Sequence, residues 1–406
     1  MRPGRLLALV LLTVAAVPLV SLAGAASLVV EAGDKERLLV PMCVEVPAAA
    51  RTARMTCQGR EVPCQVADGR LWWILDRLPA GATRTYRVEL GARPRAQEPG
   101  VVIDKGEKSL GISIGGKPFT TYHFVPGAPA GVRLHRPCFF PVYGPDMVTM
   151  TRPYPLTKDV PANVSKDHPH HTSIWVAHGA VNGVDNWAVG RGKGFQVHKT
   201  FDLVASGPVV GIFRERLEWT AADGKRPLVS EVRTVRVYNL PESHRMLDLE
   251  VTFIADHGAV VFGDTKEGGI CATRMRPEFR HDRGGRLVNS AGQTGRAAWG
   301  KKALWVDASG KVGGKRYGYA IFDAPTNLRH PTTWHARTYG LLTANPFGLS
   351  YFTGDRRNRH KGDYRLEAGG RLTFRYRIYL HRGDEQEGGV AARYDDFASP
   401  PKATWR

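Results

Sequence analysis

The sequence predicts an all-β protein, most simply a large antiparallel β-sandwich with a small N-terminal β unit. Its 45 Gly and 27 Pro residues leave little room for long helices. Runs of β-branched and aromatic residues alternate with clusters of turn-forming residues along the chain. Residues 245–255 alternate apolar with polar side chains, which is the two-residue period of a half-buried strand.

Residues 1–26 have the features of a secretory signal peptide. A basic start (1–5) precedes an apolar run (6–20), and small residues follow at 23–26. The apolar run is short for a transmembrane helix. We therefore expect an exported protein, periplasmic or extracellular, with no membrane span after the signal is cleaved.

Residues 27–95 are expected to form a small β domain, with strands at 38–46, 71–75 and 85–90. A linker follows at 96–100, at the end of the stretch 93–100, which contains two prolines and three charged residues. Cys57 and Cys64 are spaced so that a hairpin disulfide could form in an oxidising compartment, although the sequence does not fix the pairing of the five cysteines.

Residues 101–384 are expected to form the main sandwich, and 385–406 a C-terminal tail. Hairpins are predicted around Gly115-Gly116 and around Asp223-Gly224. Further strands are predicted at 245–255, 303–306, 318–322, 348–353 and 371–381. In the last of these, one face is apolar and should pack, while the other should carry charge.

The formal net charge of +19 raises the question of a partner. Lys and Arg are spread along the chain instead of forming a block, and export also argues against nucleic acid. An acidic polysaccharide or an anionic envelope surface fits better. Neither a Gly-rich dinucleotide turn nor a phosphate loop is present, so no nucleotide cofactor is expected. The cofactor stays unknown, with a divalent metal possible.

The densest cluster of polar residues is DHPHHTSIWVAHGAVNGVDNW at 167–187. Imidazole changes protonation near neutral pH and is the commonest metal ligand. On an extended strand His168 and His170 would project the same way, roughly 6–7 Å apart, and could grip one metal or one sugar, while His171 would point oppositely. His178 would join them only if the chain turns. The same stretch supplies the candidate ligand-binding residues His171, His178, Asn182, Asp185 and Trp187.

Two later stretches add candidates. In GDTKEGG, Lys266 and Glu267 follow an apolar strand, and the glycines are expected to let the backbone approach a ligand. Glu267 could be a general base, with Arg274 close by in sequence. In HPTTWHARTYG, His335 is a candidate catalytic residue, while Trp334 could stack on a sugar and Arg337 could bind a carboxylate.

Two further residues complete the candidate ligand-binding set. Asn345 lies in NPFG, and Arg152 lies in TRPYP, close to the proline-rich and aromatic RPCFFPVYGP. The guanidinium group of Arg152 could bind an anionic group.

Together these segments resemble an exported bacterial family labelled "methane oxygenase PmoA", over roughly residues 101–384. The label does not imply methane oxidation, because the membrane subunit of particulate methane monooxygenase is a bundle of transmembrane helices and this chain shows none. The resemblance implies a fold similar to the supersandwich of galactose mutarotases, in which a histidine acid and a carboxylate base flank a sugar. In this chain it implies His168, His170 or His335 as acid and Glu267 as base.

Three functions follow as hypotheses. The first is a carbohydrate-active enzyme (a lyase, hydrolase or epimerase) with histidine and glutamate as acid and base. The second is a metal-dependent enzyme in which His168 and His170 bind the metal with His335 or Glu267. The third is a glycan-binding envelope protein without catalysis.

Overall fold

The computed structural model describes residues 24–93, 100–125, 129, 131–132, 134–355 and 357–406. The predicted signal peptide lies outside these residues except for its last three, and so do residues 96–99 of the predicted linker. Within the described residues, no helix has the length and apolar character needed to cross a membrane.

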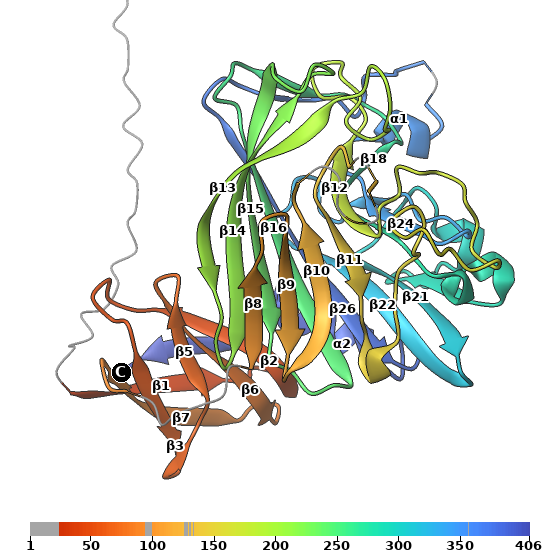
Figure 1. The fold of residues 1–406 in the computed structure, drawn as a ribbon. Coiled ribbons are helices and arrows are strands. Elements are labelled where there is room, and N and C mark those ends of the chain that lie inside the picture. The colour runs from red at the N-terminus through yellow and green to blue at the C-terminus, as the bar shows by residue number, and fades with distance from the viewer. Residues whose placement is uncertain (1–23, 94–99, 126–128, 130, 133, 356) are drawn as a thin grey trace, which may run out of the picture.

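Two large antiparallel sheets form the body of the molecule (Figure 1). In the described residues one sheet has nine strands, in the spatial order β20 (Lys301–Lys302), β23 (Thr333–Trp334), β24 (Leu341–Ala344), β18 (Gly268–Arg274), β12 (Ile174–His178), β11 (Cys138–Val142), β10 (Lys117–His123), β9 (Ser109–Ile114) and β8 (Val101–Lys105). The other has eight, in the order β13 (Phe195–Ala205), β14 (Val210–Thr220), β15 (Pro227–Tyr238), β16 (His244–Ile254), β26 (Arg371–Arg382), β22 (Lys315–Asp323), β21 (Trp305–Val312) and β19 (Arg286–Asn289). The predicted all-β sandwich is confirmed.

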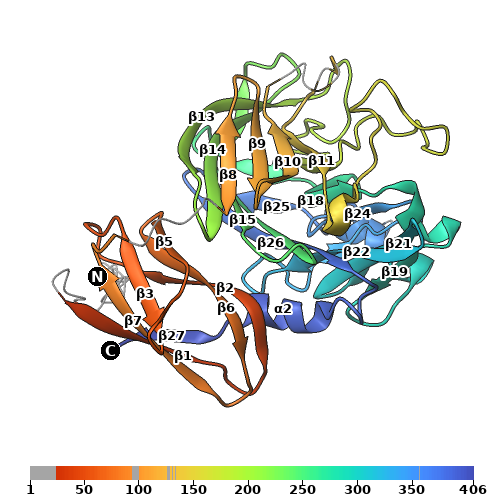
Figure 2. The same cartoon turned by 60° about the horizontal axis from the view of Figure 1, so that its bottom comes forward.

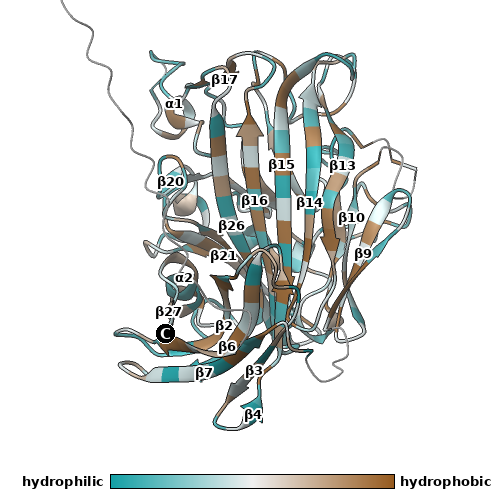
Figure 3. Cartoon of the chain, turned by 90° about the vertical axis from the view of Figure 1, so that its left-hand side faces the viewer, coloured by the Kyte–Doolittle hydropathy of each residue, from teal (hydrophilic) through white to brown (hydrophobic). Residues whose placement is uncertain are grey.

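Alternating side chains place the main core between the sheets. Ile174 and Val176 of β12 join this core, together with Leu249 of β16 and Phe374 of β26. Figure 3 shows the same alternation of hydrophobic and hydrophilic residues along β14, β15 and β16. Trp175 and Ala177 of β12 belong instead to a separate buried cluster on the opposite face of the nine-stranded sheet. Loops must therefore cover that outer face, because every residue of β12 is buried.

Both predicted hairpins are present, since β9 pairs with β10 and β14 pairs with β15. The strand predicted at 348–353 is wrong, because a short helix, α1 (Leu349–Phe352), occupies this stretch. The Asp264 carboxylate accepts the backbone N–H groups of Ser350 and Gly362, at 2.8 and 2.7 Å, and so fixes a turn where a strand was expected. The remaining short elements are β17 (Val260–Phe262), its partner β25 (Tyr364–Leu366), and the 3-10 turns η1 (Pro145–Met147), η2 (Pro277–Phe279), η3 (His281–Arg283) and η4 (Gly295–Ala298).

The second face of β26 is less exposed than its polar residues suggested. Arg377, Tyr379 and His381 are all buried. The Arg377 guanidinium binds Asp248 at 2.6 Å and lies 4.9 Å from the ring of Phe397, in helix α2 (Val390–Ala398). The C-terminal helix therefore covers this face, which the sequence of β26 alone could not show.

A smaller two-layer unit precedes the body, and the C-terminus returns to it (Figure 2). Its five-stranded sheet contains β27 (Lys402–Trp405), β1 (Ala25–Glu31), β7 (Thr83–Leu90), β3 (Ala53–Cys57) and β4 (Arg60–Glu61). Its three-stranded sheet contains β2 (Arg37–Glu45), β6 (Arg70–Leu78) and β5 (Cys64–Ala67). The ring of Trp72 lies 6.4 Å from that of Tyr238, and Asp68 pairs with Arg214 at 2.6 Å, so the unit packs on the eight-stranded sheet.

The suggested disulfide is absent, because Cys57 and Cys64 are both free thiols. The Sγ atom of Cys64 is buried and lies 3.4 Å from the carbonyl oxygen of Ala53. Burial raises the pKa of this thiol to about 12, which keeps it protonated and unreactive at neutral pH.

Candidate active site

Three of the segments selected from the sequence meet at one cavity of about 400 Å³. The histidine-rich loop leads into β12, the Lys266-Glu267 turn leads into β18, and the stretch from His335 to Tyr339 connects β23 with β24. These strands are neighbours in the nine-stranded sheet, so the segments converge although they are far apart in sequence. The cavity is lined by His168, His170, His171, Asp185, Trp187, Ala188, Lys266, Glu267, His335, Arg337 and Tyr339.

The histidine-rich loop is a tight turn and not the extended strand that the sequence suggested. The backbone N–H of His171 donates to the carbonyl oxygen of His168 at 3.0 Å, and His168 has a φ of 45°. The expectation that His171 would point away from His168 is therefore wrong. The turn brings the two rings into parallel contact, with their centroids 4.8 Å apart and an interplanar angle of 3°.

This contact belongs to a longer stack of aromatic rings. The stack runs in the order Tyr339, His168, His171, Trp175, with centroid distances of 5.5, 4.8 and 5.4 Å. Trp175 is fixed in β12, so the stack ties the imidazole rings to the rigid sheet. The ring of His170 lies outside the stack and meets His171 edge-on at 4.4 Å.

Two buried arginines, Arg152 and Arg274, fix the position of the histidine-rich loop by binding the Asp167 carboxylate. The guanidinium of Arg274 donates to the Asp167 carboxylate at 2.9 Å, and that of Arg152 donates to the same carboxylate and to the His168 carbonyl oxygen. Arg152 and Arg274 are 2% and 1% exposed, and neither lines the cavity. The prediction that they contact a ligand is therefore corrected: their donors are taken up by the protein itself.

A third buried arginine, Arg136, fixes the opposite side of the loop. Its guanidinium donates to the carbonyl oxygens of His170, Asn186 and Trp187, at 3.0, 2.7 and 2.6 Å. Burial lowers the pKa of Arg136 to about 10, so it remains a cation at neutral pH. It joins the His170 turn to the segment that places Trp187 against the cavity.

The hydrogen bonds fix opposite tautomers on two of the imidazoles. Arg274 Nη1 donates to His171 Nδ1 at 3.1 Å, so a neutral His171 carries its proton on Nε2 and is a donor. His335 Nδ1 donates to the carbonyl oxygen of Lys266 at 2.8 Å, which leaves a lone pair on Nε2. The same cavity thus receives one N–H donor and one basic nitrogen.

The state of charge supports this assignment. Burial lowers the pKa of His335 to about 4, and burial together with the positive charge of Arg136 lowers the pKa of His170 to about 4. Burial drives the pKa of His171 well below its ordinary value. All three rings are therefore neutral at pH 7, which suits the role of base for His335 and His170 and not that of acid.

His168 has a different environment. Its side chain is 42% exposed, and its Nδ1 lies 3.2 Å from a carboxylate oxygen of Asp167. Among the predicted catalytic histidines, His168 is therefore the one whose ring is reached by solvent and has a carboxylate beside it.

Lys266 and Glu267 form an ion pair at the mouth of the cavity, where each side chain is 41% exposed. Asn345 holds this turn, because its amide donates to the carbonyl oxygens of Thr265 and Lys266, at 2.9 and 3.2 Å. Asn345 is buried and does not line the cavity, so the structure gives it a positioning contact instead of the predicted ligand contact. Asp185 does line the cavity, where its carboxylate accepts a hydrogen bond from Lys193 at 2.8 Å.

The glycines of GDTKEGG make room for the protein itself and not for a ligand. A Cβ on Gly268 would lie 2.6 Å from the imidazole of His178, and one on Gly269 would lie 2.7 Å from the side chain of Thr343. Close packing of β18 against its neighbours therefore explains both glycines.

Three other predicted ligand-binding residues lie away from the cavity. His178 is fully buried and donates to the carbonyl oxygen of Gly263 at 2.9 Å. Trp334 is fully buried in the core between the sheets. The side-chain oxygen of Asn182 accepts a hydrogen bond from the backbone N–H of Val261 in β17, at 2.7 Å. Each of these side chains is committed to holding the fold.

The sequence reasoning missed Tyr339 and Ala188 as lining residues, and Asp167 and Arg136 as residues that hold the loop. Tyr339 could have been found, because it lies two residues after Arg337 and would share its face on an extended segment. No pattern in the sequence shows the other three roles.

The proposed metal site finds no support in the geometry. Among the side chains that the structure describes, no group of three or more His, Cys, Asp or Glu residues is arranged to hold a metal ion. His168 and His170 therefore do not form such a group with His335 or with Glu267.

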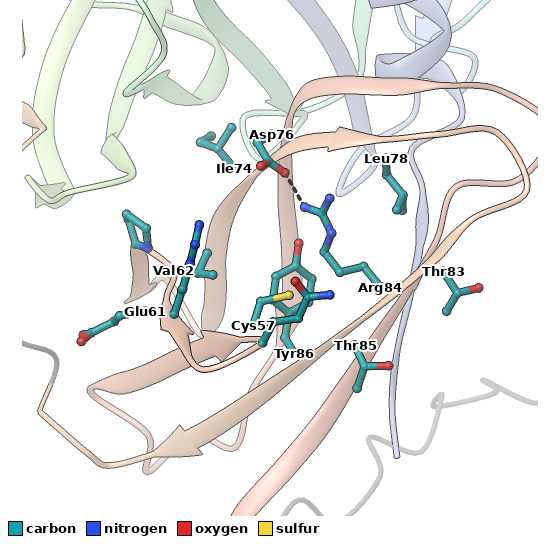
Figure 4. Close-up of a pocket in the computed structure, with 13 residues that line it drawn as sticks. Cys57, Glu61, Val62, Ile74, Asp76, Leu78, Thr83, Arg84, Thr85 and Tyr86 are labelled. Atoms are coloured by element: carbon teal, nitrogen blue, oxygen red, sulfur yellow. Dashed lines mark hydrogen bonds and ion pairs between the residues drawn. The ribbon is translucent and has the colours of Figure 1, made fainter.

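A larger cavity, of about 700 Å³, lies in the N-terminal unit between β3, β4, β6 and β7 (Figure 4). Its polar side chains include the ion pair of Arg84 with Asp76, and Tyr86 and the Cys57 thiol also line it. No histidine lines this cavity. It therefore lacks the neutral imidazoles that make the smaller cavity suited to proton transfer.

The buried imidazoles predict how stability depends on pH. Burial lowers the pKa of His178 and His335 from the ordinary 6.5 to about 4. Between these values the unfolded chain binds protons that the folded protein excludes, so the free energy of unfolding should fall as pH drops from about 6.5 to about 4. Each residue contributes up to about 3 kcal/mol to this loss, and nothing above pH 6.5, where both states are neutral.

Urea denaturation followed by tryptophan fluorescence across this pH range measures the effect. His360→Asn should keep the full pH dependence, because the His360 side chain is 85% exposed. His335→Asn should reduce it. A free energy of unfolding that does not change between these pH values would contradict the prediction.

A family model described as "Family of unknown function (DUF6807)" matches residues 109–395. That description does not mention a methane oxygenase, the label suggested by the sequence resemblance. The comparison with curated proteins gave no match.

Among solved structures, the chain is similar to an α-galactosidase from Lactobacillus brevis, with 8% identity over 71% of this chain and a TM-score of 0.31. It covers only 40% of that α-galactosidase. It is also similar to the Slr1438 protein from Synechocystis sp. PCC 6803, with 7% identity, 71% of this chain and 97% of that chain covered, and a TM-score of 0.28.

Proposed function

The chain belongs to the family of unknown function DUF6807, and because that description gives no activity, we propose a function from the site: a carbohydrate-active enzyme that transfers protons on a sugar by general acid–base catalysis. The observation that carries the proposal is one cavity that holds imidazoles in two different environments. His335 is buried and neutral, whereas His168 is half-exposed and paired with a carboxylate. Such a division separates a base from an acid.

In the proposed reaction, Nε2 of His335 accepts a proton from the sugar, and His168 donates one to a sugar oxygen. The N–H of His171 donates a hydrogen bond to the oxygen on which negative charge develops. Because one proton is taken and one is returned, the cycle needs no oxidant or reductant. An epimerase, a mutarotase or an eliminating lyase can work in this way.

Several features of the cavity support a sugar as the substrate. Its volume of about 400 Å³ lies within the range of small-molecule sites. Hydroxyl groups need both donors and acceptors, and Lys266, Glu267 and Asp185 supply both kinds in the lining of the cavity. Tyr339, which is only partly buried, lines the cavity with an aromatic ring, a surface on which the apolar face of a sugar can pack.

The proposal includes the place of action. The basic and apolar N-terminal segment supports export to the periplasm or the exterior, where the substrate would be a glycan or a sugar released from one. We also propose, from the sequence resemblance alone, that the chain is related to the PmoA-labelled family and to sugar enzymes of the mutarotase type.

Incubation with a panel of sugars in D₂O tests the function. Nuclear magnetic resonance should detect either faster anomer interconversion or deuterium bound to a sugar carbon, and mass spectrometry should detect an elimination product. His335→Asn should abolish the signal, and His360→Asn, at an exposed imidazole outside the cavity, should retain it. Tight binding of a sugar with none of these signals would instead identify a glycan-binding protein.

A further inference from the structure

A second cavity, of about 320 Å³, lies beside the candidate active site. It is lined by Arg296, Trp299, Ala336, Arg337 and Thr338. Arg337 lines both cavities, and its chain neighbour Ala336 connects the second cavity to His335. A ligand that fills the first cavity can therefore extend past Arg337 into the second.

The second cavity differs from the first in charge. Its lining contains two arginines and no carboxylate, whereas Glu267 and Asp185 line the first. Arg296 is exposed, in the turn η4, and within the described part of the chain it forms no ion pair. Arg337 is also exposed, and its guanidinium lies 5.4 Å from the ring of Tyr339. Among the residues that the structure describes, neither guanidinium forms an ion pair, and two such groups favour an anion.

The wall between the two cavities includes an aromatic ring. Trp299 meets His335 edge-on, with the ring centroids 6.3 Å apart and an interplanar angle of 81°. Phe352 packs against Trp299 at 5.5 Å and keeps it in place. A ligand in the second cavity thus contacts a fixed aromatic ring that itself supports the proposed base.

We propose that the substrate is an acidic oligosaccharide of two or more units, with the carboxylate of a uronic acid unit bound by Arg296 and Arg337 in the second cavity. The unit that reacts occupies the first cavity, and the neighbouring unit packs against Trp299. This inference rests on the proposed function, because it assumes that the first cavity takes a sugar. To the proposed function it adds that the substrate is negatively charged and contains at least two sugar units.

Calorimetric titration tests the inference by affinity, independently of turnover. The probes are trisaccharides of galacturonate, glucuronate, mannuronate and guluronate, the same trisaccharides after reduction of their carboxyl groups, and the corresponding monosaccharides. At least one acidic trisaccharide should bind about tenfold more tightly than its reduced form. Arg296→Gln should remove most of that preference and leave the affinity for the monosaccharide unchanged.

Arg371→Gln is the matched control, because Arg371 is exposed on β26, outside both cavities, and its loss should change neither affinity. Equal binding of acidic and reduced trisaccharides would overturn the inference while leaving the proposed function intact. Absence of trisaccharide binding would also overturn it. Sulfated neutral trisaccharides are titrated alongside, and binding of these in place of the uronates would overturn the assignment of a carboxylate. If acidic trisaccharides bind as expected but no sugar is turned over, the inference stands and the catalytic proposal fails.

Discussion

His335→Asn is expected to lower kcat/KM by about 100-fold or more, the usual contribution of a positioned general base. The asparagine amide can keep the hydrogen bond that Nδ1 donates to the Lys266 carbonyl oxygen at 2.8 Å, so the Lys266-Glu267 turn should stay in place. Only the basic Nε2 is lost. The melting temperature above pH 6.5 should change little, because the buried imidazole is neutral there and is replaced by a neutral side chain.

The dependence of activity on pH identifies the base in the unmodified protein. Burial lowers the pKa of His335 to about 4, so its basic form is present above that pH and is lost below it. The acid limb of kcat/KM should therefore lie near pH 4. A limb near the ordinary histidine value of 6.5 would show that a solvent-exposed imidazole is the base. Full activity in His335→Asn would reject the proposed role directly.

The sandwich could be predicted because strand alternation and turn residues are local signals. The sequence of β16 alternates polar and apolar residues, and the glycines at 115–116 mark a turn between two strands. The helix α1 could not be predicted, since it depends on Asp264, which lies more than eighty residues before it. Likewise, the burial of Arg377 depends on a helix that comes after it in the chain.

The candidate site could be predicted at the level of segments and only partly at the level of side chains. Histidine-rich and Lys-Glu stretches indicate proton transfer or ligand binding from their residue types alone, and the structure brings these stretches to one cavity. Which side chains of a segment face that cavity is a separate question. Every residue of β12 is buried, so alternation does not distinguish His178, which donates to Gly263, from a ligand-facing residue.

Arg152 and Arg274 show most clearly that the sequence does not reveal which side chains face the cavity. From sequence, Arg152 and Arg274 suggest anion binding, and they do bind an anion, but it is Asp167 of the same chain. The pairing of Arg274 with Asp167 spans 107 residues and leaves no local pattern. Positively charged side chains near a site are therefore ambiguous until their partners are known.

Asp167→Asn is expected to have the largest effect on stability and to abolish activity as well. The Asp167 carboxylate is the counter-ion of Arg152 and Arg274, whose side chains are 2% and 1% exposed. Without it, two buried cations face each other, and removing one partner of such a set costs about 3–5 kcal/mol. A loss of about 3 kcal/mol is expected, since Asp167 itself is 40% exposed and partly screened by solvent.

The loss should be visible across the neutral pH range. The two arginines hold the pKa of Asp167 well below its ordinary value, so its contribution to stability is complete above pH 3.8 and is lost only as pH falls further, through the folded pKa. Activity should fail because Arg274 no longer stays against Nδ1 of His171 and His168 loses its carboxylate partner. Urea denaturation and kcat/KM, both measured near pH 7, check the two effects.

Two further variants separate the charge effect from the loss of a side-chain contact. Asp202→Asn removes the partner of Arg216, which is 57% exposed, and should cost less than about 1 kcal/mol. Asp167→Asn combined with Arg274→Met removes one of the uncompensated cations and should recover part of the stability. It should not recover activity, because His171 then has no donor to fix its tautomer. A double variant that is active would show that the arginines stabilise the loop without setting the protonation of the imidazoles.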